Sequence, residues 1–217
     1  MLPGMKYEVL PIGPIEANCS ILWDDPAQAW VVDPGADGAD ILGFMKKRGL
    51  KAGVIVLTHG HFDHFGGVAP LAAHFGIPVY VGEADAGQMA DGGLGAMAGF
   101  DIEPVKDAIT ITGEQVLELP IEVTAIPTPG HSLGAYTFAI GEAELFVGDL
   151  IFQGSVGRTD LPGGDMDQLL NSIAGLVRRF PPDAVVHCGH GPDTSLGREL
   201  ALNPFLSPLR YDPEHRW

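Results

Sequence analysis

Three histidines and one aspartate lie within six residues, directly after a short apolar segment. The group comprises His59, His61, Asp63 and His64. Imidazole and carboxylate together suit zinc, iron or manganese better than calcium or magnesium, which favour oxygen ligands. Because residues spaced two apart on an extended turn can point the same way, His59 and His61 can hold one ion, while Asp63 and His64 can turn towards a second. The pattern predicts a metal site; a chance histidine-rich turn is the alternative.

The apolar segment before this group predicts a buried β-strand. Residues 54–57 read Val-Ile-Val-Leu and follow Gly53, a pattern typical of a strand covered on both faces. The histidines then fall on the loop at the carboxyl end of that strand. Catalytic side chains are commonly found on loops that a rigid sheet positions.

Three further candidate ligands also follow predicted strands, each just after a small residue. They are His131, Asp149 and His190. If the strands are neighbours, all seven candidates converge on one sheet edge, and the adjacent glycines let the backbone come close to the ions. Taken singly, each of these residues fits a cap or a turn. Taken jointly, they predict one shared metal site.

Strands and helices alternate in both halves of the chain. Strands are expected at 7–12, 18–23, 29–32, 54–57, 77–81, 109–112, 115–119, 122–126, 135–140, 144–147 and 184–187, with 109–112 and 115–119 forming a hairpin around Gly113. Helices are expected at 37–50, 68–75, 84–90, 165–180 and 196–202. The glycine-rich segment 82–100 is expected to end in a mobile loop near the pocket. Because the apolar faces of these elements must be buried, we expect two packed sheets flanked by helices, in one domain spanning 1–217.

The composition indicates a folded and strongly acidic protein. The chain has 217 residues, 46% of them hydrophobic, and a formal net charge of −16. That charge disfavours nucleic acid and anionic membranes as partners. No apolar run approaches the ~20 residues that span a bilayer, and residues 1–7 lack the pattern of a secretory signal, so a cytoplasmic protein is expected. The two cysteines do not make a disulfide framework, and Cys188 is expected to be a buried strand residue.

The order of these motifs resembles that of a known family. The motifs are Thr-His-Gly-His-Phe-Asp-His at 58–64, Pro-Gly-His at 129–131, Gly-Asp at 148–149 and Gly-His-Gly at 189–191. They are similar to those of the metallo-β-lactamase superfamily, and most similar to its glyoxalase II-like hydrolases. The resemblance implies an α/β fold in the form of a four-layer αββα sandwich. His64 and Asp149 are expected to separate the chain from true β-lactamases.

The resemblance also implies a ligand set for two divalent ions, for which zinc is favoured and iron or manganese also fit. It assigns His59, His61 and His131 to the first ion, and Asp63, His64 and His190 to the second, with Asp149 bridging both. Two such ions can lower the pKa of a shared water from 15.7 towards ~7, and Asp63 can orient the bridging hydroxide as a catalytic residue. Because a thiolate of pKa ~8.5 leaves without a general acid, we predict hydrolysis of thioesters, such as hydroxyacylglutathione, to a carboxylate and a thiol.

Other functions remain open at this stage. A sulfur dioxygenase would use one iron, held by His59, His131 and Asp149, on glutathione persulfide; the Gly-Arg-Thr-Asp at 157–160 is similar to a motif of those enzymes, but 151–156 lacks their Arg and Cys. A nuclease is opposed by the acidic charge, and a non-catalytic metal protein needs no glycine-opened pocket.

Two features of the sequence bear on recognition of the substrate's thiol. Arg158 is expected to form a buried pair with an aspartate that braces its loop, with binding of a substrate carboxylate as the alternative. Because few residues follow His190, we do not expect the C-terminal helical domain with which long glyoxalase II enzymes bind glutathione. The acyl group, the metal identity and the oligomeric state are not predicted.

Overall fold

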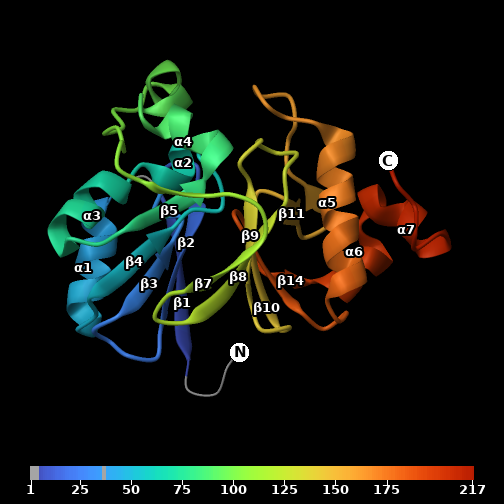
Figure 1. Ribbon diagram of the computed structural model, residues 1–217, viewed down its shortest axis with the longest axis horizontal. Coiled ribbons are helices and arrows are strands. Elements are labelled where there is room, and N and C mark those ends of the chain that lie inside the picture. Colours follow the sequence, from blue (N-terminus) through green and yellow to red (C-terminus); the bar gives the residue numbers. More distant parts are fainter. Residues whose placement is uncertain (1–4, 36–37) are drawn as a thin grey trace.

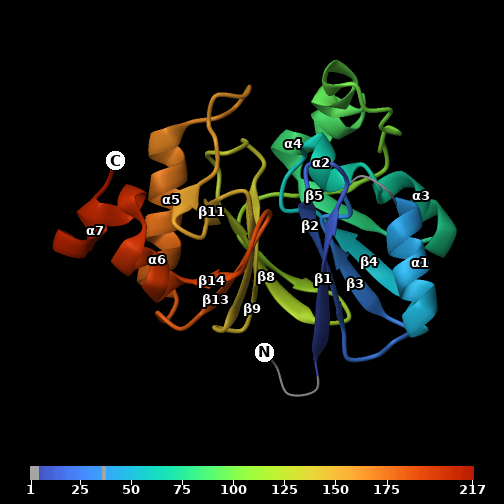
Figure 2. The ribbon, with the colours of Figure 1, turned by 180° about the vertical axis from the view of Figure 1, so that it is seen from behind.

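Two β-sheets lie face to face at the centre of the molecule, and helices cover the outer face of each (Figure 1, and from behind in Figure 2). The computed structural model describes residues 5–35 and 38–217. Each of the two large sheets has six strands. This is the expected αββα arrangement, and the expected fold class is confirmed. In the described part of the chain, no helix is long and apolar enough to cross a bilayer.

The first sheet starts as an antiparallel meander and continues with parallel strands. Its order is β1 (Lys6–Ile12), β2 (Ala17–Trp23), β3 (Ala29–Val32), β4 (Ala52–Val56), β5 (Val79–Gly82) and β6 (Ile109–Ile111). Parallel neighbours need a crossover connection, because a tight turn between two strands makes them antiparallel. The helices α1 (Gly38–Arg48) and α3 (Val68–Phe75) supply two of them, and their buried Ile41, Met45 and Leu71 pack on the sheet.

The second sheet is mostly antiparallel. Its order is β14 (Thr194–Ser195), β13 (Val185–Cys188), β10 (Glu144–Gly148), β9 (Tyr136–Ile140), β8 (Glu122–Pro127) and β7 (Gln115–Glu118). Only β10 and β13 run parallel in it. The crossover between them is α5 (Met166–Arg179), whose apolar face packs on the sheet through Leu169 and Ile173. Asp165 caps the start of α5, since its side chain accepts a hydrogen bond from the backbone N–H of Gln168 at 2.9 Å.

Shorter elements connect and flank the sheets. They are α2 (Phe62–Phe65), α4 (Glu83–Met89), the 3-10 helix η1 (Gly93–Ala98), the hairpin of β11 (Ile151–Phe152) and β12 (Ser155–Val156), α6 (Leu196–Leu202), the 3-10 helix η2 (Pro204–Leu206) and α7 (Ser207–Tyr211). Between the sheets, a separate apolar core contains Trp30 and Val56 from the first sheet, and Phe138 and Phe146 from the second. Each sheet therefore has one buried face towards its partner and another towards its helices.

Two expectations about these elements need correction. The strands near 109–112 and 115–119 do not form a hairpin, because β6 pairs with β5 and β7 pairs with β8 in the other sheet. Ile111 and Leu117 both enter the core between the sheets, so the turn at Gly113 carries the chain from one sheet to the other. The segment 92–99, expected to be a loop, contains regular structure, since the 3-10 helix η1 occupies most of it. Residue 37, expected in a helix, and residues 1–4 lie outside the described residues.

Candidate metal centre

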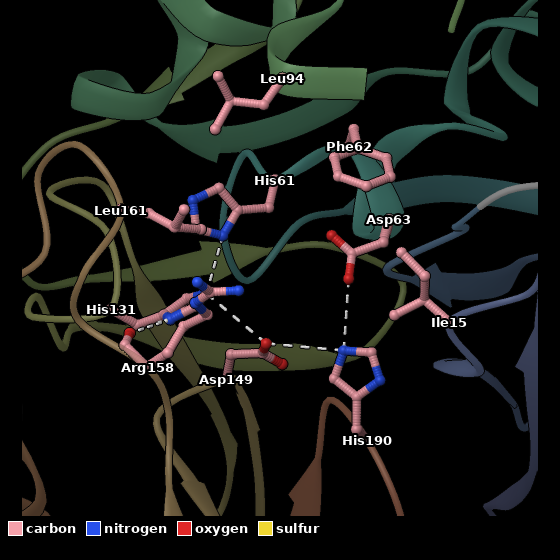
Figure 3. A pocket seen from close by; sticks show the side chains of 10 residues that line it. All are labelled: Ile15, His61, Phe62, Asp63, Leu94, His131, Asp149, Arg158, Leu161 and His190. Atoms are coloured by element: carbon pink, nitrogen blue, oxygen red, sulfur yellow. Dashed lines mark hydrogen bonds and ion pairs between the residues drawn. The ribbon is translucent and has the colours of Figure 1, made fainter. Parts of the chain in front are cut away.

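All seven candidate ligands come together at the carboxyl ends of strands from both sheets. The loop after β4 and the short helix α2 contribute His59, His61, Asp63 and His64, whereas the ends of β8, β10 and β13 contribute His131, Asp149 and His190. The expectation of one shared sheet edge is therefore wrong in part. The site lies where the edges of two facing sheets meet (Figure 3), with four ligands from the first sheet's side and three from the second's.

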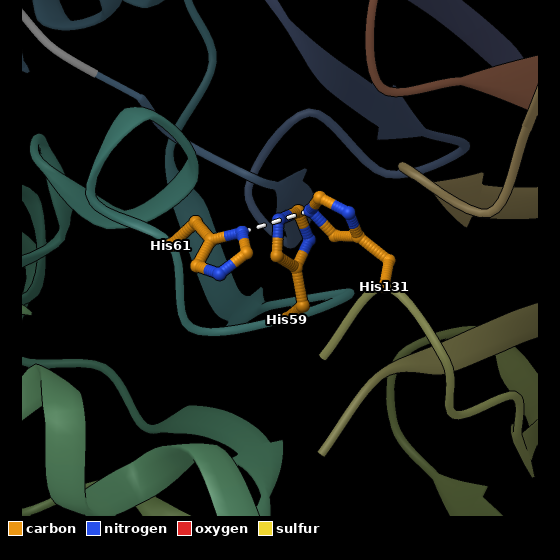
Figure 4. Close-up of side chains that lie close together, drawn as sticks. All are labelled: His59, His61 and His131. Atoms are coloured by element: carbon orange, nitrogen blue, oxygen red, sulfur yellow. Dashed lines mark hydrogen bonds between the residues drawn. The ribbon is translucent and has the colours of Figure 1, made fainter. Parts of the chain in front are cut away.

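His59, His61 and His131 form the first donor group, drawn in Figure 4. Their ligand nitrogens all lie within 4.8 Å of one another, and His61 Nδ1 is 2.8 Å from His131 Nε2. His59 Nε2 is buried and has no hydrogen-bond partner among the described residues. A buried polar atom without a partner is costly unless something else satisfies it, so this nitrogen fits a metal ligand.

Burial makes these imidazoles good ligands. Burial, with the neighbouring histidines, lowers the pKa of His59 well below its usual value. Burial, with His131 beside it, lowers the pKa of His61 to about 4. Both rings are therefore neutral near pH 7, and the neutral imidazole is the form that binds a metal ion.

Hydrogen bonds at the far side of the rings set their orientation. His131 Nδ1 donates to the backbone carbonyl of Arg158 at 2.7 Å, and His59 Nδ1 lies 3.1 Å from Thr58 Oγ1. In both residues Nε2 is left to face the site, whereas His61 presents its Nδ1. Such contacts fix the tautomer and angle of a metal-binding histidine.

Asp63, His64 and His190 form the second donor group. His190 Nε2 lies 3.4 Å from both Asp63 Oδ2 and His64 Nε2. Burial lowers the pKa values of His64 and His190, but the nearby carboxylates outweigh it and raise both. The group thus attracts positive charge, which a divalent ion would supply.

Asp149 lies between the two groups. Its Oδ1 is 3.3 Å from His64 Nε2, and its Oδ2 is 3.6 Å from both His131 Nε2 and His190 Nε2. Burial alone would raise the pKa of Asp149, but these imidazoles outweigh it and lower the pKa well below the usual range. Asp149 Oδ1 is buried and makes no hydrogen bond to the described residues. This position and charge suit a carboxylate that two ions share.

Asp33 is a functional candidate that the sequence reasoning missed. It follows β3, and its carboxylate accepts hydrogen bonds from Thr58 N at 2.7 Å, Thr58 Oγ1 at 2.5 Å and His64 Nδ1 at 3.0 Å. Because Thr58 also contacts His59, one buried carboxylate orients a histidine of each donor group. The available signal was its position directly after a strand, the same position as the other ligands.

Asp85 was missed as well. This buried carboxylate in α4 accepts hydrogen bonds from Gly60 N at 2.8 Å, Ser132 Oγ at 2.6 Å and Gly134 N at 2.8 Å. It thereby joins the loop after β4 to the loop after β8, and these two loops carry the first donor group. Nothing in the sequence near position 85 indicates this role.

The donors open into a pocket of about 500 Å³. Its lining consists of Ile15, His61, Phe62, Asp63, Leu94, His131, Asp149, Arg158, Leu161 and His190 (Figure 3). A close approach of backbone to donor occurs at Gly189, where a Cβ would collide with Asp149 Oδ1. The expected role of a glycine in opening the site holds at this position.

Three residues differ from, or refine, their expected roles. Arg158 pairs with Asp160 as expected, through two contacts of 2.7 Å, but the pair is not buried: the two side chains are 61% and 68% exposed, because their segment lies at the pocket mouth. Cys188 is a buried strand residue as expected, and burial raises the pKa of its thiol to about 12. His187, at the end of the strand expected at 184–187, is buried and contacts Glu144 and Asp193.

Comparison with known families agrees with this geometry. The family model described as the metallo-beta-lactamase superfamily matches residues 12–190. The chain is 37% identical to the "Probable metallo-hydrolase YqgX" of Bacillus subtilis, over 94% of this chain and 98% of the relative. It is 32% identical to the "Hydroxyacylglutathione hydrolase GloC" of Haemophilus influenzae, over 94% of this chain and 99% of the relative.

Solved structures give a similar result. The structure of the BLEG-1 B3 metallo-beta-lactamase superposes with a TM-score of 0.88 at 38% identity, covering 93% of this chain and 100% of that one. The structure of TTHA1623 in a di-iron-bound form superposes with a TM-score of 0.83 at 36% identity, covering 92% and 100%. The expectation that His64 and Asp149 separate the chain from true β-lactamases stays a prediction.

Proposed function

The chain belongs to the metallo-β-lactamase superfamily, and from that premise we propose that it is a dinuclear metal-dependent hydrolase of thioesters. The observation that carries the proposal is the placement of Asp149 between two donor groups, within 3.6 Å of a histidine nitrogen in each. Membership of the superfamily supports hydrolase chemistry in general. The thioester substrate and the pair of ions are the specific parts of the proposal.

Two divalent ions held by these donors, zinc or alternatively iron or manganese, would supply the Lewis acidity that ionises water near neutral pH and stabilises a developing oxyanion. Asp63 lines the pocket and would accept a hydrogen bond from the attacking water, which orients it. Burial raises the pKa of Asp63, but His190 and His64 outweigh it and lower the pKa, so the carboxylate stays an acceptor.

The leaving group decides between substrate classes. Water adds its oxygen to the thioester carbonyl carbon, the C–S bond breaks, and the sulfur departs with the bonding electrons while the water's proton goes to solvent. A thiolate of pKa ~8.5 can leave in this form, whereas an amine must be protonated first. Apart from candidate ligands, Arg158 is the only polar residue among the described residues that line the pocket, and a guanidinium does not give up its proton.

The named relatives support parts of this proposal. GloC is named a hydroxyacylglutathione hydrolase, and a thioester of that kind is the substrate class we propose. TTHA1623 is described in a di-iron form, which supports two ions for this site and puts iron beside zinc as a candidate. BLEG-1, named a B3 metallo-beta-lactamase, makes β-lactams the second candidate substrate class, although the lining offers no acid for the leaving nitrogen.

One experiment separates these possibilities. Purified protein is assayed with S-D-lactoylglutathione and other acyl thioesters, with a chromogenic β-lactam, and for oxygen uptake with glutathione persulfide, while metal content is measured by mass spectrometry. We expect about two ions per chain and thioester hydrolysis, both lost in Asp149→Asn and kept in the control Asp101→Asn, an exposed acid outside the site. Full activity of Asp149→Asn would refute the mechanism, and oxygen uptake with one iron per chain would indicate a sulfur dioxygenase.

A further inference from the structure

Beyond the seven donors, the pocket wall is mainly apolar. Besides its five candidate ligands and Arg158, the pocket is lined by Ile15, Phe62, Leu94 and Leu161. Figure 3 shows these four side chains placed around the donors, above and to both sides of Asp149. We propose that the pocket selects thioesters whose acyl or thiol arm is uncharged and apolar, in preference to the charged arm of glutathione. This inference rests on the thioester hydrolysis proposed above.

The four apolar residues come from separate segments of the chain. Ile15 is in the turn between β1 and β2, Phe62 begins α2, Leu94 is in η1, and Leu161 follows the β11–β12 hairpin. Ile15 is 43% exposed although it lies beside the pocket. Because Ile15 is also part of the pocket lining, its exposed surface is available to an apolar group that enters the pocket.

The wall has a firm base on one side. The ring of Phe62 lies against that of Phe100, with 5.1 Å between the ring centres, and a Cβ on Gly95 would meet the side chains of Ile102 and Phe62. The helix α2 and the segment around η1 are therefore packed together. Because Phe62 is fixed by this packing, an apolar arm gains contact with the ring without first having to order it.

The charges at the pocket mouth disfavour a carboxylate-bearing arm. In the part of the lining that the structure describes, Arg158 is the only cationic side chain outside the donor set. Its Nε and Nη2 each contact an oxygen of Asp160 at 2.7 Å, so one of the two edges with which a guanidinium binds a carboxylate in parallel is occupied and the adjacent aspartate offsets its charge. The chain as a whole carries a formal charge of −16, which further opposes an anionic arm.

The size of the preference follows from burial. A methylene transferred fully from water gains ~0.8 kcal/mol, about fourfold in binding, and a partly exposed wall gives about twofold to fourfold. The pocket of about 500 Å³ falls in the range typical of small-ligand sites. We therefore expect selectivity to grow over the first few carbons of an arm.

The test uses matched thioesters on the metal-loaded protein. One series joins acetyl, butyryl and hexanoyl groups to N-acetylcysteamine, a second joins lactate to ethane-, butane- and hexanethiol, and both are compared with the same acyl groups on glutathione. We expect kcat/KM to rise about twofold to fourfold per methylene in at least one series, with the uncharged thiols preferred. A flat response in both series, with glutathione thioesters preferred, would overturn the inference but not the proposed function. Failure to hydrolyse any thioester would refute the proposed function itself.

Variants locate the effect. Ile15→Ser and Leu94→Ser are expected to lower kcat/KM for the longest arm about threefold to tenfold, while the matched controls Ile109→Ser and Leu202→Ser, at exposed apolar positions outside the pocket lining, do not. Calorimetry with non-hydrolysable thioether analogues gives a second readout: the negative heat-capacity change of apolar burial should shrink in the two pocket variants. If the pocket variants and the control variants behave alike, the apolar lining residues do not bind the substrate arm and the inference is refuted.

Substitutions in the Arg158–Asp160 ion pair test separately whether charge at the pocket disfavours a carboxylate-bearing arm. In Asp160→Asn the guanidinium loses its anionic partner, so the ratio of kcat/KM for glutathione thioesters to that for uncharged thioesters should rise severalfold. Arg158→Gln should not lower that ratio in the native background, because Asp160 already offsets the charge of the guanidinium. A large loss of the glutathione thioester activity in Arg158→Gln would show that Arg158 binds the substrate directly, and would overturn this part of the inference.

Discussion

Replacing Asp33 by Asn should weaken metal binding at both donor groups, and at the second group more. Asn is nearly isosteric with Asp and tolerates the left-handed backbone that Asp33 adopts, with φ 49°. Oδ2 accepts from Thr58 Oγ1 and from His64 Nδ1, and an amide nitrogen in its place cannot accept from either. If the amide is turned round, the bond from Thr58 N is lost instead.

The magnitude follows from the contacts that are lost. The bond from His64 holds that ring with Nε2 towards the site, and loss of such a contact beyond the ligands typically costs 10–100-fold in metal affinity. That factor corresponds to about 1.4–2.7 kcal/mol. His59 is reached only through Thr58, at 3.1 Å, so we expect a smaller loss, about threefold to tenfold, at the first group.

The assay is competition of the protein with a chromophoric chelator, which yields two dissociation constants, alongside circular dichroism of the metal-free protein to verify folding. Asp24→Asn, at an exposed turn residue, is the matched control. Unchanged affinity at both sites in a folded Asp33→Asn protein would refute the orienting role. An equal loss of metal affinity at both sites would contradict the expectation that the direct contact of Asp33 to His64 matters more than its indirect contact to His59 through Thr58.

Three further predictions concern other buried groups. Burial lowers the pKa of His187, but Asp193 and Glu144 outweigh it and raise the pKa. The stability that His187 contributes is therefore complete below its unfolded pKa near 6.5 and is lost as pH rises through the folded pKa, so urea unfolding of the metal-free protein should show a free energy of unfolding that falls over this range. His187→Gln should abolish the fall, and the same fall in that variant would contradict the prediction. Asp85→Asn should lower the free energy of unfolding by about 1–3 kcal/mol and weaken the first metal site, as measured by denaturation and chelator competition; retention of both properties would show that the carboxylate does not hold the two loops. Gly189→Ala should reduce metal content below two ions per chain, because its Cβ would collide with the shared carboxylate, and a variant that still binds two ions with full activity would contradict the close approach.

Local patterns predicted much of the fold because hydrophobic periodicity and end signals agree in those segments. The helices Val68–Phe75 and Leu196–Leu202 and the strand Ala29–Val32 have the expected bounds. What failed was pairing: the turn at Gly113 has hairpin composition, yet its two strands join different sheets. Strand pairing depends on which core each side chain enters, and that is a property of the whole chain.

The candidate site was predictable where chemistry is concentrated in short motifs. The histidine cluster and the three ligands after strands were found from residue types and positions, and the structure brings them together. Asp33 and Asp85 were not found, because a single aspartate in a loop or helix resembles any surface or capping aspartate. Their roles depend on hydrogen bonds to residues 25 to 49 positions away along the chain. The exposure of the Arg158–Asp160 pair likewise depends on where the loop lies in the folded molecule.

The central claim is that Asp149 is shared by two metal ions. Anomalous X-ray diffraction from crystals of the metal-loaded protein tests it most directly. We predict two peaks ~3.5–4 Å apart, one beside His59, His61 and His131 and the other beside Asp63, His64 and His190, with the Asp149 carboxylate between them. A single peak at full occupancy, or two peaks of which neither contacts Asp149, would contradict the account.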